Sequence, residues 1–294
     1  MPNLKAIRVR IASVKSTRQI TSAMKMVSAA KLRKAQDKIV RLRPYANKLH
    51  DILVNLSQSL AESQVENIYA REGTPEKVLI VMITSNRGLC GAFNTNVVKE
   101  ARNLVAEAYF DQYKKGNVKF LTIGKNGFDN MRKHKFPIAA EFNDLLNDLT
   151  FERTVTIAEK VMQAFTAGEY DRVELIYNHF KNAAVQQLTR EVFLPVQSVQ
   201  GEAKASVNTD YIYEPGKEEI IRELIPKSLK IQFYKAILDS FVAENGARMT
   251  AMHKATDNAT TMISELTLQY NKARQASITN QILEVVSGAE ALKG

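Results

Sequence analysis

Residues 4–30 read LKAIRVRIASVKSTRQITSAMKMVSAA, and the apolar side chains that open this stretch recur at three- and four-residue intervals. They are Leu4, Ile7, Ile11 and Val14. Such spacing is typical of an amphipathic helix with a narrow apolar stripe. After a shift of phase we expect the stripe to resume through Ile20, Met24 and Val27 and to reach about residue 60. A helix over residues 3–60 would be about 85 Å long at ~1.5 Å per residue. That length predicts a partner helix.

A second long helical pattern occupies residues 217–292, at the other end of the chain. Its apolar residues are Leu229, Phe233, Ile237, Phe241, Met262, Leu266, Tyr270, Ala273, Ile282, Leu283 and Val286. Residues 21–30 and 246–262 are both rich in Ala, Ser, Thr and Met, and small side chains let two helix axes approach closely. The two ends are therefore predicted to pair as a long antiparallel coiled coil, although an ordinary bundle core fits the local composition equally well.

Between these helices the chain alternates between strand-like and helix-like segments. Strands are predicted at VLIVMITS (78–85), VKFLTIG (118–124), RVELIYNHF (172–180) and QQLTREVFLPV (186–196), and helices near 95–115, 126–135 and 151–167. Alternation of this kind predicts a layered domain with a parallel sheet. The expected fold is α/β, with a central Rossmann-like parallel-sheet domain carried by a coiled coil. We expect three segments, 1–60, 75–200 and 210–294, with a polar connector at 197–216.

Charge is concentrated at the start of the chain. Residues 1–48 contain thirteen Lys or Arg against one acid, Asp37, whereas the whole chain of 294 residues carries only +10. A field of that sign attracts nucleic acid, anionic lipid or an acidic protein surface. The hydrophobic content of 45% excludes wholesale disorder. The single cysteine excludes an internal disulfide. The first residues are Arg-rich like a mitochondrial presequence, but the helical pattern continues past Asp37, so we expect them to belong to the mature protein.

No catalytic, cofactor or metal site emerges from the sequence. The loop SNRGLCGAFN (85–94) follows the first predicted strand, where nucleotide-binding sheets hold phosphate. It lacks both the P-loop and the GxGxxG spacing, so a tight turn or a partner contact is expected there. The four histidines stand far apart, and never at metal-ligand spacing. Cys90 is expected to be a buried small apolar residue.

Three stretches carry a resemblance to a known family. They are IASVKSTRQITSAMKMVSAAKLRKAQ (11–36), the segment 247–292 that begins ARMTAMHKATDNATTM, and RGLCG (87–91). Taken in their order along the chain, the three stretches resemble the gamma subunit of proton-translocating ATP synthases. The resemblance implies a non-catalytic rotor shaft, standing inside a ring of three alternating alpha and beta subunits. It also implies that the α/β domain lies against the epsilon subunit and the membrane ring of c subunits. The location implied is peripheral, on the cytoplasmic face of a bacterial plasma (inner) membrane, with no cofactor and no nucleic acid.

The resemblance also assigns partner contacts by position. It implies that the shaft meets an acidic loop of the beta subunits at Met24, with Lys25 beside it, and that Arg248 lies near that contact. An upper bearing is implied at Arg274, Gln275, Thr279 and Glu284. A foot contact is implied at Arg87, Gly88, Leu89, Cys90 and Gly91. Two positions depart from the family pattern, since Asn86 replaces a usual Asp and Gln281 a frequent Glu. Each lacks the charge that an ion pair there would need.

Two other functions are compatible with parts of the sequence. A nucleic-acid-binding coiled coil could use residues 5–48 as its basic arm, but a basic zipper separates its basic region from its leucine seam, whereas here the two interleave. A dinucleotide-dependent enzyme could be built on the central domain. The rotor shaft remains the favoured prediction.

Overall fold

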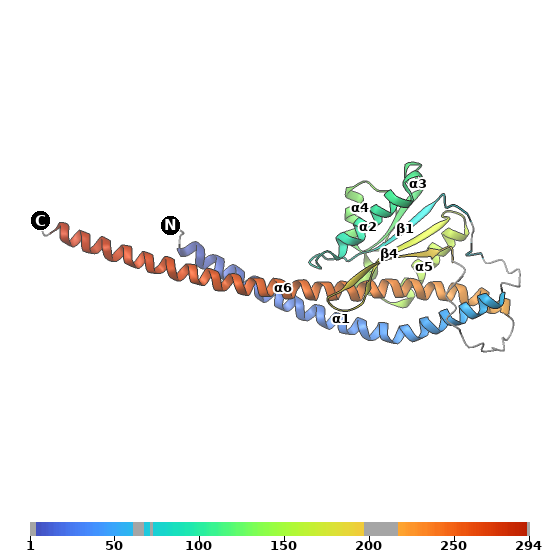
Figure 1. The fold of residues 1–294 in the computed structure, drawn as a ribbon, viewed down its shortest axis with the longest axis horizontal. Helices are drawn as coiled ribbons and strands as arrows, with labels where there is room; N and C mark the ends of the chain where they lie inside the picture. The colour runs from blue at the N-terminus through green and yellow to red at the C-terminus, as the bar shows by residue number, and fades with distance from the viewer. Residues whose placement is uncertain (1–3, 61–67, 71–72, 197–216, 293–294) are drawn as a thin grey trace. The chain divides into compact units, whose positions relative to one another are not determined.

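The computed structural model describes residues 4–60, 68–70, 73–196 and 217–292. The chain divides into two compact units: residues 1–29 with 248–294, and residues 30–247. Two long helices, α1 (Leu4–Leu60) and α6 (Lys217–Ala291), each contribute one part to each unit (Figure 1). The two helices predicted from the terminal apolar patterns are therefore confirmed. The predicted connector at 197–216 lies outside the described residues.

The first unit is a pair of antiparallel helices, which we call the helix-pair unit. Thr21 Oγ1 lies 2.8 Å from Thr256 Oγ1, and Arg8 Nη2 donates to the Tyr270 hydroxyl at 2.8 Å. Residues later in α1 thus contact residues earlier in α6, which means that the two helices run antiparallel. Within this unit, the buried and half-buried residues of α1 are Leu4, Ile7, Ile11, Val14, Arg18, Thr21, Lys25 and Ser28, with Ser22, Met24 and Ala29 beside them. Their main series repeats every seven residues, which is the seam of a left-handed coiled coil.

The predicted shift of phase after Val14 is wrong. The seam keeps its seven-residue repeat through small or amphipathic side chains, because Thr21 is satisfied by Thr256 and is only 9% exposed. Ile20 and Val27, which we expected on the seam, are instead 60% and 56% exposed. Met24 is half-buried beside the seam. The prediction followed the apolar residues, whereas this part of the seam is formed largely by polar side chains.

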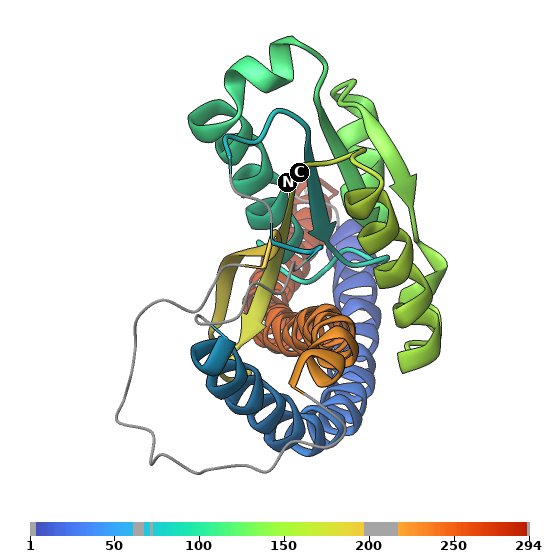
Figure 2. The same ribbon diagram turned by 90° about the vertical axis from the view of Figure 1, so that its right-hand side faces the viewer.

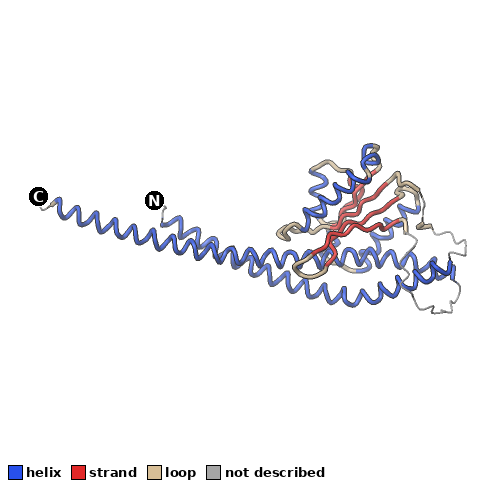
Figure 3. The backbone as a smooth tube through the Cα atoms, viewed as in Figure 1, coloured by secondary structure: helices blue, strands red, loops and turns tan. Residues whose placement is uncertain are grey.

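The second unit contains a five-stranded sheet in the order β3-β2-β1-β4-β5 (Figure 3). Its strands are β1 (Val78–Ile83), β2 (Val118–Ile123), β3 (Ile138–Glu141), β4 (Arg172–Phe180) and β5 (Gln186–Leu194). β1 pairs in parallel with both β2 and β4, and β2 with β3. β5 pairs antiparallel to β4 at the edge. The α/β class is confirmed, with a mixed sheet. The four-residue strand β3 was not predicted, because its half-exposed IAAE has no apolar run.

Helices pack against the sheet and bury its apolar strands. They are α2 (Phe93–Ala108), α3 (Phe110–Lys114), α4 (Lys125–Lys133), the 3₁₀ turn η1 (Asp144–Asn147) and α5 (Phe151–Thr166). The side of β1 that carries Val78, Ile80 and Met82 packs in one cluster with α2 and with Met131 of α4. The helix predicted over 95–115 is two helices, since Tyr109 leaves helical geometry at φ −129°.

Helix α6 is buried against β5 and α5 over its first part. Phe233 packs on Phe193 of β5, and Tyr234 on Phe151 of α5, each with ring centres 5.4 Å apart. Lys230 Nζ also pairs with Glu159 Oε1 of α5 at 2.6 Å. Figure 2 shows this part of α6, in orange, beside the yellow strands, with the later part of α1 curving around it. Lys38 Nζ of α1 donates to Leu149 O at 3.4 Å, so the α/β domain contacts both long helices within this unit.

Candidate partner-contact sites

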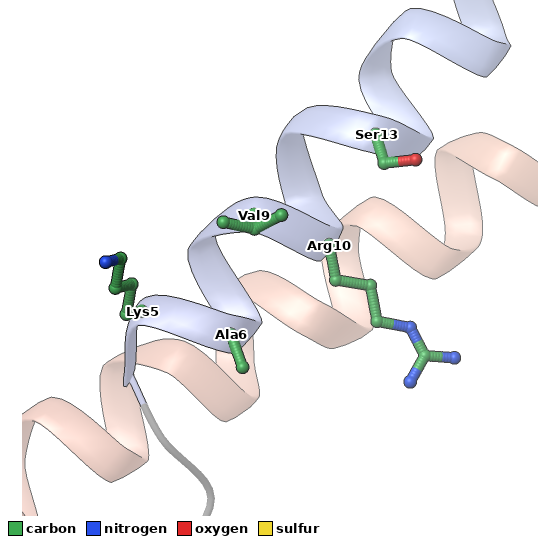
Figure 4. Close-up of a pocket in the computed structure, with 5 residues that line it drawn as sticks. All are labelled: Lys5, Ala6, Val9, Arg10 and Ser13. Carbon is green, nitrogen blue, oxygen red and sulfur yellow. The ribbon is translucent and has the colours of Figure 1, made fainter.

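An uncharged stripe runs along α1 in the helix-pair unit, on the side away from the seam. It consists of Val9, Ser13, Ser16, Ile20, Ala23 and Val27, all exposed. At ~100° per residue these positions lie roughly opposite the seam positions. Figure 4 shows the start of this outer stripe, where Lys5, Ala6, Val9, Arg10 and Ser13 line a surface hollow. Sequence reasoning assigned Ile20 and Val27 to the seam and so missed this stripe, although a strict seven-residue repeat would have separated the two faces.

The predicted shaft contact at Met24 and Lys25 lies on the same helix. Both side chains are half-buried, and Lys25 occupies a seam position. Arg248 on α6 belongs to the same unit and is 9% exposed. These three residues are therefore less accessible than the outer stripe, and Met24 and Lys25 can offer only part of their side chains to another protein.

The predicted bearing residues lie at the far end of α6. Arg274, Gln275, Thr279 and Glu284 are all exposed. The Thr279 hydroxyl donates to its own helix at Gln275 O, 3.0 Å away. Every residue from Gln281 to Leu292 is exposed, including Ile282 (58%) and Val285 (71%). A helix end with so much uncovered apolar surface is suited to a protein contact.

One contact beside these residues was not predicted. The Arg8 guanidinium lies 5.7 Å from the centre of the Tyr270 ring in addition to its hydrogen bond to the hydroxyl. The hydrogen bond from Arg8, together with the positive charges of Arg8 and Arg274, lowers the pKa of Tyr270. An Arg eight positions from the start and a Tyr 262 residues later give no local signal of pairing, so only the register of the helix pair could have revealed it.

The foot loop of Arg87–Gly91 is anchored at its base and exposed at its tip. Ser85 Oγ donates to Arg87 O at 2.7 Å, and Asn94 Nδ2 lies 3.3 Å from Cys90 Sγ. Leu89 is 63% exposed and adopts φ +64°, and Gly91 adopts φ +62°. Cys90 is only 2% exposed, which confirms its predicted burial. Arg87 and Leu89 are therefore the side chains that this loop presents.

The carboxyl ends of β1 and β2 are filled by protein groups where a nucleotide sheet would hold phosphate. Thr84 Oγ1 accepts from the Gly127 amide at 2.9 Å, Ser85 O from the Asn126 amide at 3.1 Å, and Asn86 Oδ1 from the Lys125 amide at 3.0 Å. These amides belong to the first turn of α4, where a phosphate would otherwise bind. Asn86 Nδ2 also donates to Asn143 O at 2.7 Å, which the carboxylate of an Asp at this position could not do. This arrangement disfavours the dinucleotide-enzyme alternative.

Two fully buried carboxylates also escaped sequence reasoning. Glu174 on β4 is contacted by Arg172, Arg190 and the Tyr109 hydroxyl. Burial and this hydrogen bond raise the pKa of Tyr109. Asp239 on α6 is contacted by His179. Burial raises the pKa of Asp239, while the charges of His179, Arg43 and Lys235 oppose that rise. Within the described residues, no group of three or more His, Cys, Asp or Glu is arranged to hold a metal ion.

Comparisons with known proteins agree with this architecture over the whole chain. The family model described as ATP synthase matches residues 3–292. The ATP synthase gamma chain of Flavobacterium johnsoniae is 57% identical over 100% of both chains. The ATP synthase gamma chain of Cytophaga hutchinsonii is 52% identical over 99% of each. Among the described helices, none is long and apolar enough to span a bilayer.

Solved structures show the same fold. A chain of the central stalk and c-ring structure of the Tetrahymena thermophila mitochondrial ATP synthase is 26% identical, with a TM-score of 0.61 over 80% of this chain and 99% of that one. A chain of the Euglena gracilis mitochondrial ATP synthase, solved with OSCP, F1 and c-ring, is 21% identical, with a TM-score of 0.66 over 98% of this chain and 94% of that one. Family model, relatives and fold thus point the same way, and the chain belongs to the family of ATP synthase gamma chains, the subunit of the central stalk.

Proposed function

We propose that this chain is the rotor shaft that transmits torque between a proton-driven ring of c subunits and a catalytic head of alpha and beta subunits. The observation that carries it is the seven-residue seam of the helix-pair unit. Two helices that interlock along such a seam resist bending and twisting together, whereas a single helix of that length does not. The Thr21–Thr256 hydroxyl pair lies within this seam and favours one register of the two helices.

The outer stripe and the end of α6 supply the surfaces that turn inside the head. The stripe from Val9 to Val27 carries small or apolar side chains and no charge. A surface of this kind can slide past successive subunits, because it makes no directional ion pair that each step would have to break. The exposed Ile282, Val285 and Leu292 would serve as a bearing in the same way.

Positive charge lies farther along α1 and suits a long-range attraction to acidic loops of the beta subunits. Lys31, Arg33, Lys34 and Lys38 are all exposed. Attraction between solvated charges acts without direct contact over about one Debye length, which is about 8 Å at physiological salt. Such contacts can form and release during rotation. Lys25 would add to them at the edge of the seam.

The α/β domain supplies the foot. We place the epsilon subunit and the c ring at this domain, with Arg87 and Leu89 of the foot loop among the contact residues. The chain would then be a non-catalytic, peripheral subunit on the cytoplasmic face of a bacterial plasma membrane. It would hold no nucleotide of its own, in keeping with the protein groups that fill the carboxyl ends of β1 and β2.

Reconstitution tests this function directly. The full chain is combined with alpha and beta subunits, and the complex is isolated and assayed for ATP hydrolysis. It is then combined with epsilon and membranes that contain the c ring, and ATP-driven proton pumping is measured. One copy of the chain in each complex, with pumping that depends on it, is the expected result. A complex that assembles and pumps equally well without the chain would exclude the shaft function.

A further inference from the structure

Two carboxylates of the second unit, Glu174 and Asp239, are 0% exposed and are satisfied to different degrees. Glu174 accepts from Arg172 Nε at 3.0 Å, from Arg190 Nε at 2.7 Å and from the Tyr109 hydroxyl. Among the described residues, Asp239 has one hydrogen-bond partner, His179 Nδ1, at 2.9 Å from its Oδ2. Its Oδ1 is buried without a hydrogen-bond partner in the described structure. The guanidinium of Arg43 lies near that oxygen, with its Nη2 at 3.8 Å from Oδ1.

This difference separates a stabilising carboxylate from a costly one. Removing a carboxylate from water is expensive, and close donors must offset the lost hydration. Glu174 has two charged donors at short range, whereas Asp239 is 0% exposed and leaves one oxygen unmet. Arg43 lies beyond hydrogen-bond distance and is 43% exposed, so its attraction is partly screened. Asp239 is therefore a poor contributor to folding stability, and its presence calls for another explanation.

Asp239 and its two charged contacts lie on three different segments. Asp239 itself is on α6, His179 is on the sheet strand β4, and Arg43 is on α1. Among the described residues, the printed partners of Glu174 all belong to the α/β domain: Tyr109 between α2 and α3, Arg172 on β4 and Arg190 on β5. The hydrogen bond of Gln232 with Glu191, at 2.6 Å, joins the sheet to α6 alone. Asp239 thus ties the sheet to both long helices at one point.

We propose that Asp239 is a positioning residue of the shaft, which fixes the α/β domain on α1 and α6 so that rotation of the domain is passed to the helices. This role rests on the proposed function. The carboxylate holds His179 on one oxygen and keeps Arg43 near the other. A load applied at the sheet is thereby shared between the two helices at this point.

The test compares four substitutions in the full reconstituted complex. Asp239→Asn keeps the shape and removes the charge, Arg43→Gln removes the partner on α1, and Glu174→Gln serves as the matched buried carboxylate within the domain. Arg41→Gln, an exposed cation on the same helix, is the control for charge. For each variant the melting temperature of the full chain is measured, followed by proton pumping per ATP hydrolysed in complexes purified to equal subunit content.

The expected pattern is opposite for the two carboxylates. Asp239→Asn leaves the melting temperature unchanged or higher and lowers the pumping ratio by about two-fold or more, which is the usual range for a residue on a coupling path. Arg43→Gln lowers the ratio similarly, and Arg41→Gln does not. Glu174→Gln lowers the melting temperature and keeps the ratio. A normal ratio in Asp239→Asn, or a fall matched by Glu174→Gln, would overturn the positioning role. If the unsubstituted chain fails to support pumping, the proposed function itself fails, and the two results are told apart.

Discussion

Arg8 near the start of α1 donates a hydrogen bond to the hydroxyl of Tyr270 on α6 at 2.8 Å, and its guanidinium also lies over the ring of that tyrosine. The pair closes the helix-pair unit close to the first described turn of α1. Beyond it, α6 continues to Ala291 with its last turns uncovered. The Arg8–Tyr270 pair, which we call the polar clasp, thus lies near the end of the seam. The predicted bearing residues follow it along α6.

This clasp predicts an altered titration of one tyrosine. Because Arg8 donates to the hydroxyl and adds positive charge, the ionised form of Tyr270 is favoured and its pKa is lowered. Arg8→Gln should move the titration of Tyr270 back toward higher pH. The measurement is the ultraviolet absorbance of tyrosinate against pH, with Tyr270→Phe used to identify the contribution of that residue. An identical curve for Arg8→Gln and the unsubstituted chain would contradict the contact.

The turn after β2 predicts a strict requirement for glycine. Gly124 adopts φ +99°, and a Cβ there would meet the backbone carbonyl of Thr84. Gly124→Ala should therefore destabilise the protein by about 2–4 kcal/mol, since both backbone strain and a steric clash result. Gly88 has ordinary φ and open space around it, so Gly88→Ala should change stability by less than about 0.5 kcal/mol. Urea unfolding of both variants gives the comparison, and equal midpoints would be inconsistent with the turn described.

Asp239 predicts a particular dependence of stability on pH. Burial raises its pKa above the ordinary value of 3.8, against the charges of His179, Arg43 and Lys235. The folded state therefore binds more protons than the unfolded state as pH rises from 3.8 to the raised pKa, so stability is lost over that interval. Above the raised pKa, the loss of stability is complete and no longer changes with pH. The free energy of unfolding of Asp239→Asn, minus that of the unsubstituted chain, should increase with pH and then level off.

Two other groups could confuse this measurement. The His179 imidazole contacts the carboxylate directly, and the negative charge of Asp239 also acts on the Tyr177 hydroxyl of β4. The comparison is therefore made with His179→Gln in both proteins, which removes the imidazole. Tyr177 stays protonated, because burial and the charges of Glu191 and Asp239 raise its pKa. A difference that does not vary with pH would show that Asp239 is not buried as a carboxylate.

The sequence was sufficient for the long helices and most of the sheet, because their apolar patterns are long and regular. It was insufficient where a polar residue occupies an apolar position. Thr21 and Ser28 lie in the seam only because α6 comes close enough to cover them, and Thr256 supplies a hydrogen bond. Asp239 likewise lies in an ordinary helical segment, and nothing local shows that it faces His179, 60 residues earlier. The bearing and foot residues came from resemblance, and their contacts stay predictions.

The last prediction separates the two faces of α1. Ile20 is 60% exposed on the outer stripe, whereas Ile7 is 8% exposed on the seam. Ile20→Lys should leave the folding of the chain unchanged, because the new charge remains in water. It should weaken assembly with the alpha and beta subunits, because the proposed apolar contact would then have to bury that charge.

Ile7→Lys should instead destabilise the helix pair by about 2–4 kcal/mol through lost packing and a charge forced into the seam. Thermal unfolding of the free chains and the affinity of each for the alpha–beta complex distinguish these effects. Normal assembly of Ile20→Lys would mean that the outer stripe faces solvent rather than the head.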